Sequence, residues 1–166
     1  MGVFKKIFTM PFRLNEKRKV NKYLKNVNIS QIDSLNGYDF EEYIATLFES
    51  CGFKCDTTPK SKDNGVDIIA TKNNIKIAIQ TKLYYNHKVS NSAIQQVYTG
   101  CIYHKCDIPM VITNSFFSKP SQQVAKSLKV LRFDRKHLEN IINKSKSDKK
   151  YILDNIMYNY LNSSEN

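Results

Sequence analysis

The chain has 166 residues, of which 41% are hydrophobic, and a formal net charge of +11 at pH 7. This length suffices for one domain with a buried core. No apolar stretch reaches the roughly 18 residues that a membrane-spanning helix needs, and the opening residues are too short and too interrupted for a secretory signal. The excess of positive charge favours a polyanionic partner, either nucleic acid or an anionic membrane.

Most of the positive charge lies in a basic N-terminal arm, residues 1–30. The arm holds eight Lys or Arg and one acidic residue, a net +7 of the total +11. Apolar side chains, several of them aromatic, are interspersed with the basic ones. Three interpretations stay open: an arm that contacts DNA, an interfacial membrane anchor, or a helix that packs on the rest of the chain.

A helix is predicted over residues 32–50. Asn36 or Asp39 can cap its start, and Gly52 is well placed to end it. Glu41 is expected in the first turn, where the helix dipole favours acidic side chains. The apolar positions recur with the spacing of a core-facing stripe, at Phe40, Tyr43, Ile44, Leu47 and Phe48.

A β-hairpin is predicted next, from apolar runs at residues 66–71 and 75–83. Two asparagines separate the runs, and Asn tolerates the left-handed backbone of a tight turn. The two-residue period of a strand puts Gln80 and Lys82 on the same face. Asp67 stands at the start of the neighbouring strand and can face them.

A carboxylate, an amide oxygen and an ammonium would then meet at one place. A hard cation such as Mg²⁺ prefers oxygen ligands, and it polarises a phosphate and lowers the pKa of a bound water. A nearby lysine can hold that water or stabilise developing negative charge. The pattern therefore favours metal-assisted phosphodiester hydrolysis. The alternative is a plain hairpin whose polar face is only solvated, because short motifs often occur by chance.

The remaining elements alternate between strand and helix. This alternation predicts an α/β fold, a mixed central sheet flanked by helices on both faces. The helix after the hairpin should bury a stripe that includes Cys101 and Ile102. The predicted elements are strands at residues 53–58, 108–113 and 130–133 and helices at residues 91–104, 118–128, 136–142 and 151–161. We divide the chain into the arm at residues 1–30, a core domain at residues 31–143, and a Lys-rich linker with a final helix at residues 144–166.

Four cysteines fit neither a common zinc knuckle nor a dense disulfide framework. Free thiols in a reducing, cytoplasmic setting are therefore expected. His104 lies between Cys101 and Cys106, which keeps a zinc site open as an alternative. The cysteines are Cys51, Cys55, Cys101 and Cys106.

The hairpin carries D-x-G-V-D, which ends at Asp67, followed thirteen residues later by Q-x-K at Gln80. This arrangement resembles the Mrr-type branch of the PD-(D/E)XK nucleases, a restriction-endonuclease-like fold. Three further segments are similar to that family in the same order, and the likeness spans residues 35–143. They are G-Y-D-F-E at residues 37–41, C-G-F-K-C at residues 51–55 and V-I-T-N-S-F-F-S at residues 111–118.

The resemblance implies a Mg²⁺-dependent DNA endonuclease, with Mn²⁺ as a possible substitute, acting in restriction or defence. Asp67, Gln80, the backbone carbonyl of Thr81 and Glu41 would hold the metal, and Lys82 would orient the attacking water. Gln80 stands where most of the wider superfamily has an acidic residue, so a more weakly held metal is expected. This neutral residue also leaves open a catalytically silent DNA-binding module with the same fold.

DNA is the partner that the resemblance implies, and cutting both strands would favour a homodimer. The loop after the hairpin places aromatic and basic residues beside the expected site, where they suit phosphate and base contacts. In the resembled family, a Gln of the following helix also approaches the site. The candidate contact residues are Tyr84, His87, Lys88 and Gln95, with Gln96 as a further option.

Overall fold

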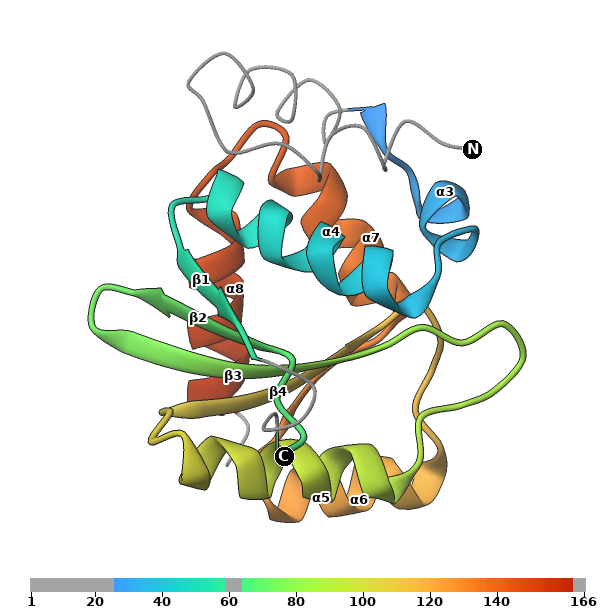
Figure 1. Cartoon of the computed structure of the whole chain (residues 1–166), viewed down its shortest axis with the longest axis vertical. Coiled ribbons are helices and arrows are strands. Elements are labelled where there is room, and N and C mark those ends of the chain that lie inside the picture. The colour runs from blue at the N-terminus through green and yellow to red at the C-terminus, as the bar shows by residue number, and fades with distance from the viewer. Residues whose placement is uncertain (1–25, 59–63, 163–166) are drawn as a thin grey trace.

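The computed structural model describes residues 26–58 and 64–162, and the predicted basic arm lies almost entirely outside these ranges. A five-stranded sheet forms the centre of the molecule, in the order β1-β2-β3-β4-β5 (Figure 1). The first three strands pair antiparallel, and β3, β4 and β5 pair parallel. The strands are β1 (Lys54–Thr57), β2 (Ile68–Lys72), β3 (Ile75–Lys82), β4 (Ile108–Thr113) and β5 (Leu131–Phe133).

Helices cover both faces of this sheet, which confirms the predicted mixed sheet with flanking helices. Figure 1 shows α4 and α7 on one face and α5 and α6 on the other, and α8 adds Ile152 and Ile156 to the apolar cluster of the first face. Each face has its own cluster of buried apolar side chains. The helices are α3 (Ile29–Asp33), α4 (Gly37–Ser50), α5 (Asn91–Tyr103), α6 (Lys119–Ser127), α7 (Arg135–Lys144) and α8 (Tyr151–Leu161).

The single helix predicted over residues 32–50 is wrong, because two helices occupy this region. α3 ends at Asp33 and α4 begins at Gly37. The break arises at Asn36, whose side-chain oxygen accepts a hydrogen bond from the backbone N–H of Asp39 at 2.9 Å and so caps a new helix. Glu41 consequently lies in the second turn of α4, not in the first as expected.

The predicted stripe of α4 is confirmed, since all five of its residues are buried. The stripe predicted for α5 is wrong at Ile102, which is 64% exposed. This residue is about 100° further round the helix than Cys101, which is buried. α5 lies flat on the sheet, so only a narrow stripe of its surface is covered.

The hairpin of β2 and β3 has the predicted turn. Asn73 and Asn74 adopt positive φ angles of 52° and 62°, the left-handed region that asparagine tolerates. β2 begins at Ile68, two residues later than predicted, because Asn64 and Gly65 turn the chain immediately before it at φ angles of 45° and 82°.

α8 packs back onto the sheet, one of the two arrangements that its amphipathic pattern allows. Ile152 and Ile156 are fully buried and belong to the same apolar cluster as α4 and α7. Within residues 26–58 and 64–162, no helix is both long and apolar enough to cross a membrane.

Candidate active site

The backbone of Asp67 is held on both sides. Its N–H donates to the carbonyl of Ile79 on β3 at 2.8 Å, and its carbonyl accepts from the N–H of Thr58 at 3.0 Å. The hydroxyl of Thr58 also donates to the carbonyl of Val66. Asp67 therefore extends the hydrogen-bond ladder of the sheet by one residue beyond β2. The position of its Cα, and so the origin of its side chain, is fixed by these backbone hydrogen bonds.

The carboxylate of Asp67 lies against the end of β3. Its Oδ2 atom accepts three hydrogen bonds: from the side-chain amide of Gln80 at 2.6 Å, and from the backbone N–H and hydroxyl of Thr81 at 2.7 and 2.9 Å. Gln80 and Thr81 are buried. Among the described residues, the other oxygen, Oδ1, accepts no hydrogen bond, so it can bind a ligand.

Lys82 lies on the same face of β3 as Gln80. Side chains of β3 alternate between the two faces of the sheet. Ala78 is buried in the cluster under α5 and α6, whereas Ile77 and Ile79 are buried in the cluster under α4, so Gln80 and Lys82 share the face of Ala78. Lys82 is half-buried and forms no ion pair with Asp67. The structure thus brings Asp67, Gln80 and Thr81 into contact and places Lys82 two residues along the same face.

The amide of Gln80 presents its NH₂ group to Asp67. A glutamate here would have no proton to donate, so this contact depends on the neutral side chain. With Nε2 engaged, Oε1 of the same amide is the atom that can bind a cation. Oδ1 of Asp67 and Oε1 of Gln80 are both oxygen donors of the kind that Mg²⁺ prefers.

Glu41 is half-buried on α4, the helix on the opposite face of the sheet. Its neighbour Glu42 is less ready to ionise, because burial raises the pKa of its carboxyl. A hydrogen bond from Tyr38 opposes that rise, and the charge of Asp39 adds to it. The role of Glu41 in metal binding stays a prediction.

The oxygen atoms of Asp67 and Gln80 suit a hard cation such as Mg²⁺, and they carry only one negative charge between them. No group of three or more His, Cys, Asp or Glu side chains that could hold a metal ion occurs within residues 26–58 and 64–162. A site built on Asp67 and Gln80 is of another kind, with one carboxylate, one amide oxygen and adjacent backbone. The four cysteines are free, and burial raises the pKa of Cys55 and Cys101 to about 12.

The loop that follows β3 is held by Asn114, which comes directly after β4. Its Oδ1 accepts from the N–H of Tyr84 at 2.8 Å, and its Nδ2 donates to the carbonyl of Tyr84 at 3.0 Å and to Asp33 at 2.9 Å. Asn114 is only 3% exposed. The Asn114 side chain thus pairs with both backbone groups of Tyr84, as a neighbouring strand would, and so fixes the start of the loop.

Asp33 and Arg135 complete this arrangement, which the sequence reasoning missed. The guanidinium of Arg135 donates to both carboxylate oxygens of Asp33, at 2.7 and 2.8 Å. This pair lowers the pKa of the Asp33 carboxyl against the effect of burial. The two residues are 102 positions apart, so the only signal in the sequence was Asn114 itself, inside a segment similar to the family motif.

The predicted nucleic-acid contacts lie around this loop. Tyr84 is half-buried and meets the ring of His87 edge-on, with centroids 6.2 Å apart. His87, Lys88 and Gln95 are exposed. Figure 1 shows the loop projecting beyond the edge of the sheet. These residues are accessible to a ligand, and their role stays a prediction.

Gln96, the further option on α5, supports the site in another way. Its backbone lies against Gly65, where an added Cβ would come within 2.8 Å of the Gln96 carbonyl oxygen. The turn that leads into Asp67 is therefore packed directly on α5.

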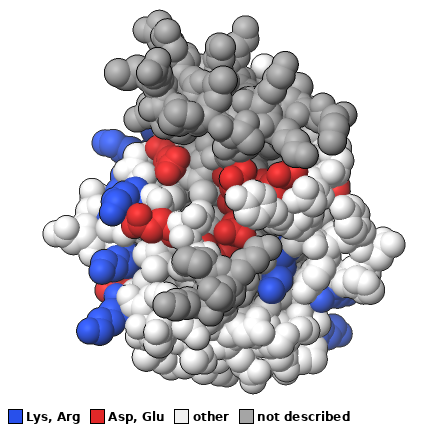
Figure 2. Space-filling model, in the orientation of Figure 1, with Lys and Arg blue, Asp and Glu red and all other residues white. Residues whose placement is uncertain are grey.

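Charge is unevenly distributed over the surface. Figure 2 shows Asp and Glu side chains gathered across the middle of one face, with Lys and Arg towards its sides. A negative region of this kind attracts cations and repels phosphate.

The family model Mrr_cat, described as a restriction endonuclease, matches residues 32–142. No curated protein matches the chain. Among solved structures, a protein of unknown function, AF1548, aligns with a TM-score of 0.54 at 18% identity over 73% of this chain and 77% of its own.

Two restriction endonucleases also align with the chain. The DNA modification-dependent restriction endonuclease AspBHI aligns with a TM-score of 0.55 at 14% identity, over 95% of this chain and 43% of its own. MspJI, in complex with a 27-mer oligonucleotide, gives 0.48 at 16% identity over 96% and 39%. The chain thus spans less than half the length of either enzyme. AF1548 and AspBHI show that the fold is shared, and the family model covers most of the chain, which belongs to the Mrr-type restriction endonuclease family.

Proposed function

We propose that this chain is a divalent-metal-dependent endonuclease that hydrolyses DNA phosphodiester bonds. The observation that carries the proposal is the contact between Asp67 and Gln80, at 2.6 Å, with Lys82 on the same face of β3. A rigid pair of oxygen ligands beside an ammonium is what this reaction requires. Family membership supports the same conclusion.

Each residue has a distinct task in this proposal. Asp67 and Gln80 would hold Mg²⁺ or Mn²⁺ through Oδ1 and Oε1, with the carbonyl of Thr81 and the carboxylate of Glu41 in support. The ion, when bound, supplies Lewis-acid activation of the phosphate and of water. Lys82 orients the attacking water and stabilises negative charge on the phosphate. The N–H and hydroxyl of Thr81 hold Oδ2 of Asp67, which leaves Oδ1 as the oxygen proposed for the metal.

DNA would lie along the carboxyl-terminal ends of β3 and β4, beside the loop held by Asn114. Tyr84, His87, Lys88 and Gln95 are the proposed contacts, with phosphate contacts setting position. Cutting both strands would need two sites, and a homodimer supplies them. Restriction or defence is the proposed setting, and the free cysteines accord with a reducing cytoplasm.

A plasmid-nicking assay with Mg²⁺ or Mn²⁺ tests this proposal. We expect Lys82→Ala and Asp67→Ala each to lower the rate by about 10²-fold or more, the scale of losing one transition-state contact. Asp56→Asn is the matched control, because Asp56 is exposed on β1 and, among the described residues, forms an ion pair only with Lys54 at 3.3 Å. Equal cleavage by the wild type and both alanine variants would refute the mechanism.

One observation favours a second candidate, a DNA-binding module without catalysis. The NH₂ group of Gln80 satisfies Asp67 directly, so the pair is stable without a metal ion. Calorimetric titration with Mn²⁺ separates the two functions. A silent module would bind DNA but give neither a heat of Mn²⁺ binding nor nicking. The nuclease would give a heat of Mn²⁺ binding and would nick the plasmid.

Membrane anchoring by the basic arm depends on residues outside the described ranges and stays a prediction. Liposome binding by the full chain and by a variant lacking residues 1–14 tests it. Binding that survives the deletion would exclude the arm as the anchor.

A further inference from the structure

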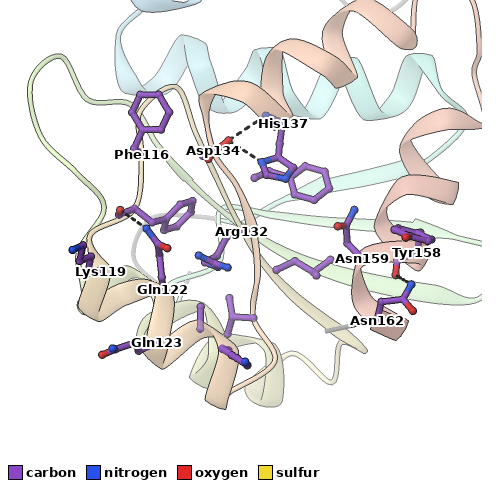
Figure 3. A pocket seen from close by; sticks show the side chains of 16 residues that line it. Phe116, Lys119, Gln122, Gln123, Arg132, Asp134, His137, Tyr158, Asn159 and Asn162 are labelled. Carbon is purple, nitrogen blue, oxygen red and sulfur yellow. Dashed lines mark hydrogen bonds and ion pairs between the residues drawn. The ribbon is translucent and has the colours of Figure 1, made fainter. Parts of the chain in front are cut away.

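A groove with a volume of about 790 Å³ lies beside the edge strand β5, away from Asp67 (Figure 3). Its walls are α6 on one side and α8 on the other, and β5 forms the floor between them. Figure 3 shows Arg132 between Gln122 of α6 and Asn159 of α8. We call this hollow the Arg132 groove. Its volume is within the range of about 300–1,000 Å³ that is usual for ligand sites.

The Arg132 groove is aligned with the candidate active site through the sheet. Gln80 is in register with Val111, and Val111 is in register with Arg132. The side chains of these three residues leave the same face of three neighbouring parallel strands. Because adjacent strands lie about 4.8 Å apart, the backbones of Gln80 and Arg132 are about 10 Å apart. Val111 is fully buried between them, so a strand of nucleic acid at the active site would reach the groove around the carboxyl ends of β4 and β5, past Phe116 and Phe117, which line the groove.

The guanidinium of Arg132 has donors to spare. It lies over the ring of Phe117, 5.9 Å from the centroid, and within the described part of the chain it forms no hydrogen bond or ion pair. Burial lowers the pKa of this guanidinium, and the charge of Asp134 opposes that effect. Asp134 itself is engaged by His137, at 2.7 Å, and caps α7. A partly desolvated guanidinium without an acceptor is suited to an anionic ligand.

The rest of the lining matches a nucleotide. Lys119, at the start of α6, adds a second positive charge to the groove. Phe116 and Tyr158 are large aromatic side chains with 40% and 69% of their surface exposed. Exposed aromatic rings beside basic groups are typical of sites where unpaired bases stack and phosphates are neutralised.

We propose that the Arg132 groove binds an unpaired nucleotide of the DNA strand that passes through the active site, with Arg132 on a phosphate and Tyr158 or Phe116 stacked on the base. The preferred DNA would then carry a single-stranded extension or a distorted, unstacked region. This inference rests on the proposed nuclease function, and it names the kind of DNA that the same site takes.

The test compares binding of the full chain to a blunt duplex and to the same duplex with a single-stranded extension. Fluorescence anisotropy in EDTA measures affinity without cleavage. We expect Arg132→Met to weaken binding of the extended duplex by about tenfold, the scale of one charge-assisted hydrogen bond, and to leave the blunt duplex nearly unchanged. For Arg132→Met on the extended duplex, the slope of log K against log[salt] should be smaller in magnitude by about 0.7, the value for one phosphate contact to a single strand.

Lys54→Met is the matched control, because it removes one positive charge from β1, at the opposite edge of the sheet. Equal weakening on both duplexes, or a loss no greater than that of Lys54→Met, would overturn the inference. If Arg132→Met does not fold, Arg132→Lys and Tyr158→Ala are measured instead, and they should weaken binding of the extended duplex more than binding of the blunt duplex. Because binding is measured without metal, a chain that binds the extended duplex but does not nick would refute the proposed nuclease and not the groove.

Discussion

A Gln80→Glu substitution separates the hydrogen bond that the Gln80 amide donates to Asp67 from the metal coordination proposed for the same amide. In the metal-free protein its NH₂ group donates to Asp67 at 2.6 Å in a place where Gln80 is only 5% exposed. Glutamate has no such donor, and its charge would face another carboxylate. Losing one hydrogen bond to a charged group costs about 2 kcal/mol. For a chain of this length that corresponds to a melting temperature lower by about 4–8 °C in EDTA.

The same substitution should strengthen metal binding, because it supplies a second anionic ligand. A tenfold lower Kd for Mn²⁺ corresponds to about 1.4 kcal/mol. At saturating metal this gain would return about 3–6 °C of the lost melting temperature. Differential scanning fluorimetry with and without Mn²⁺, together with calorimetric titration, measures both effects.

Gln123→Glu is the matched control, since it makes the same chemical change on an exposed position of α6. It should alter neither the melting temperature in EDTA nor the response to metal. If Gln80→Glu is as stable as the wild type without metal, the hydrogen bond to Asp67 does not stabilise the fold. If Mn²⁺ stabilises both proteins equally, Gln80 is not a ligand.

The remaining predictions concern the supports of the site. Gly100→Ala would bring a Cβ within 2.5 Å of the Asn64 carbonyl; we expect a loss of about 1–3 kcal/mol in urea unfolding and slower nicking, because the turn before Asp67 must move. Gly37→Ala, with nothing within 4 Å, should leave both unchanged, and an equal loss in both variants would contradict this steric account. Asn114→Ala removes three hydrogen bonds, about 3 kcal/mol in all, and hydrogen exchange at the Tyr84 amide should quicken; unchanged exchange would show that the loop is held elsewhere. The hydrogen bond from Arg135 is the main cause that lowers the folded-state pKa of Asp33. The stability that the Asp33 carboxylate contributes is therefore fully present above the unfolded pKa of about 3.9, and it is lost as pH falls through the lower folded pKa. The melting temperatures of the wild type and Asp33→Asn should therefore converge below about pH 4, and a constant difference down to low pH would refute the ion pair's role.

The elements that could be predicted from the sequence are those set by local pattern. The hairpin followed from its two-residue alternation and from the left-handed turn at Asn73 and Asn74, and β4 followed from a continuous apolar run. The proximity of Asp67 and Gln80 was predicted because only a short hairpin separates them.

The features that could not be predicted depend on tertiary contacts. The break before α4 is the exception: its cap at Asn36 is a local contact that the sequence offers, and it was missed because an apolar pattern continues across it. The pairing of Asp33 with Arg135 joins two ends of the domain, and no spacing in the sequence indicates it. Arg132 looks like one more basic residue until the register of β3, β4 and β5 places it in line with Gln80.

The order of the strands across the sheet is also their order along the chain. Every strand therefore pairs with the one made just before it. The antiparallel pairs β1–β2 and β2–β3 are joined by short connections, which cost little entropy to close, whereas the parallel pairs β3–β4 and β4–β5 need crossovers through α5 and α6. The more local pairings, those of β1 to β3, are the kind associated with fast formation. The hairpin of β2 and β3, which lies in the first part of this series, could assemble before β4 and β5 are in place. Insertions at the later end of the chain would then leave this hairpin intact.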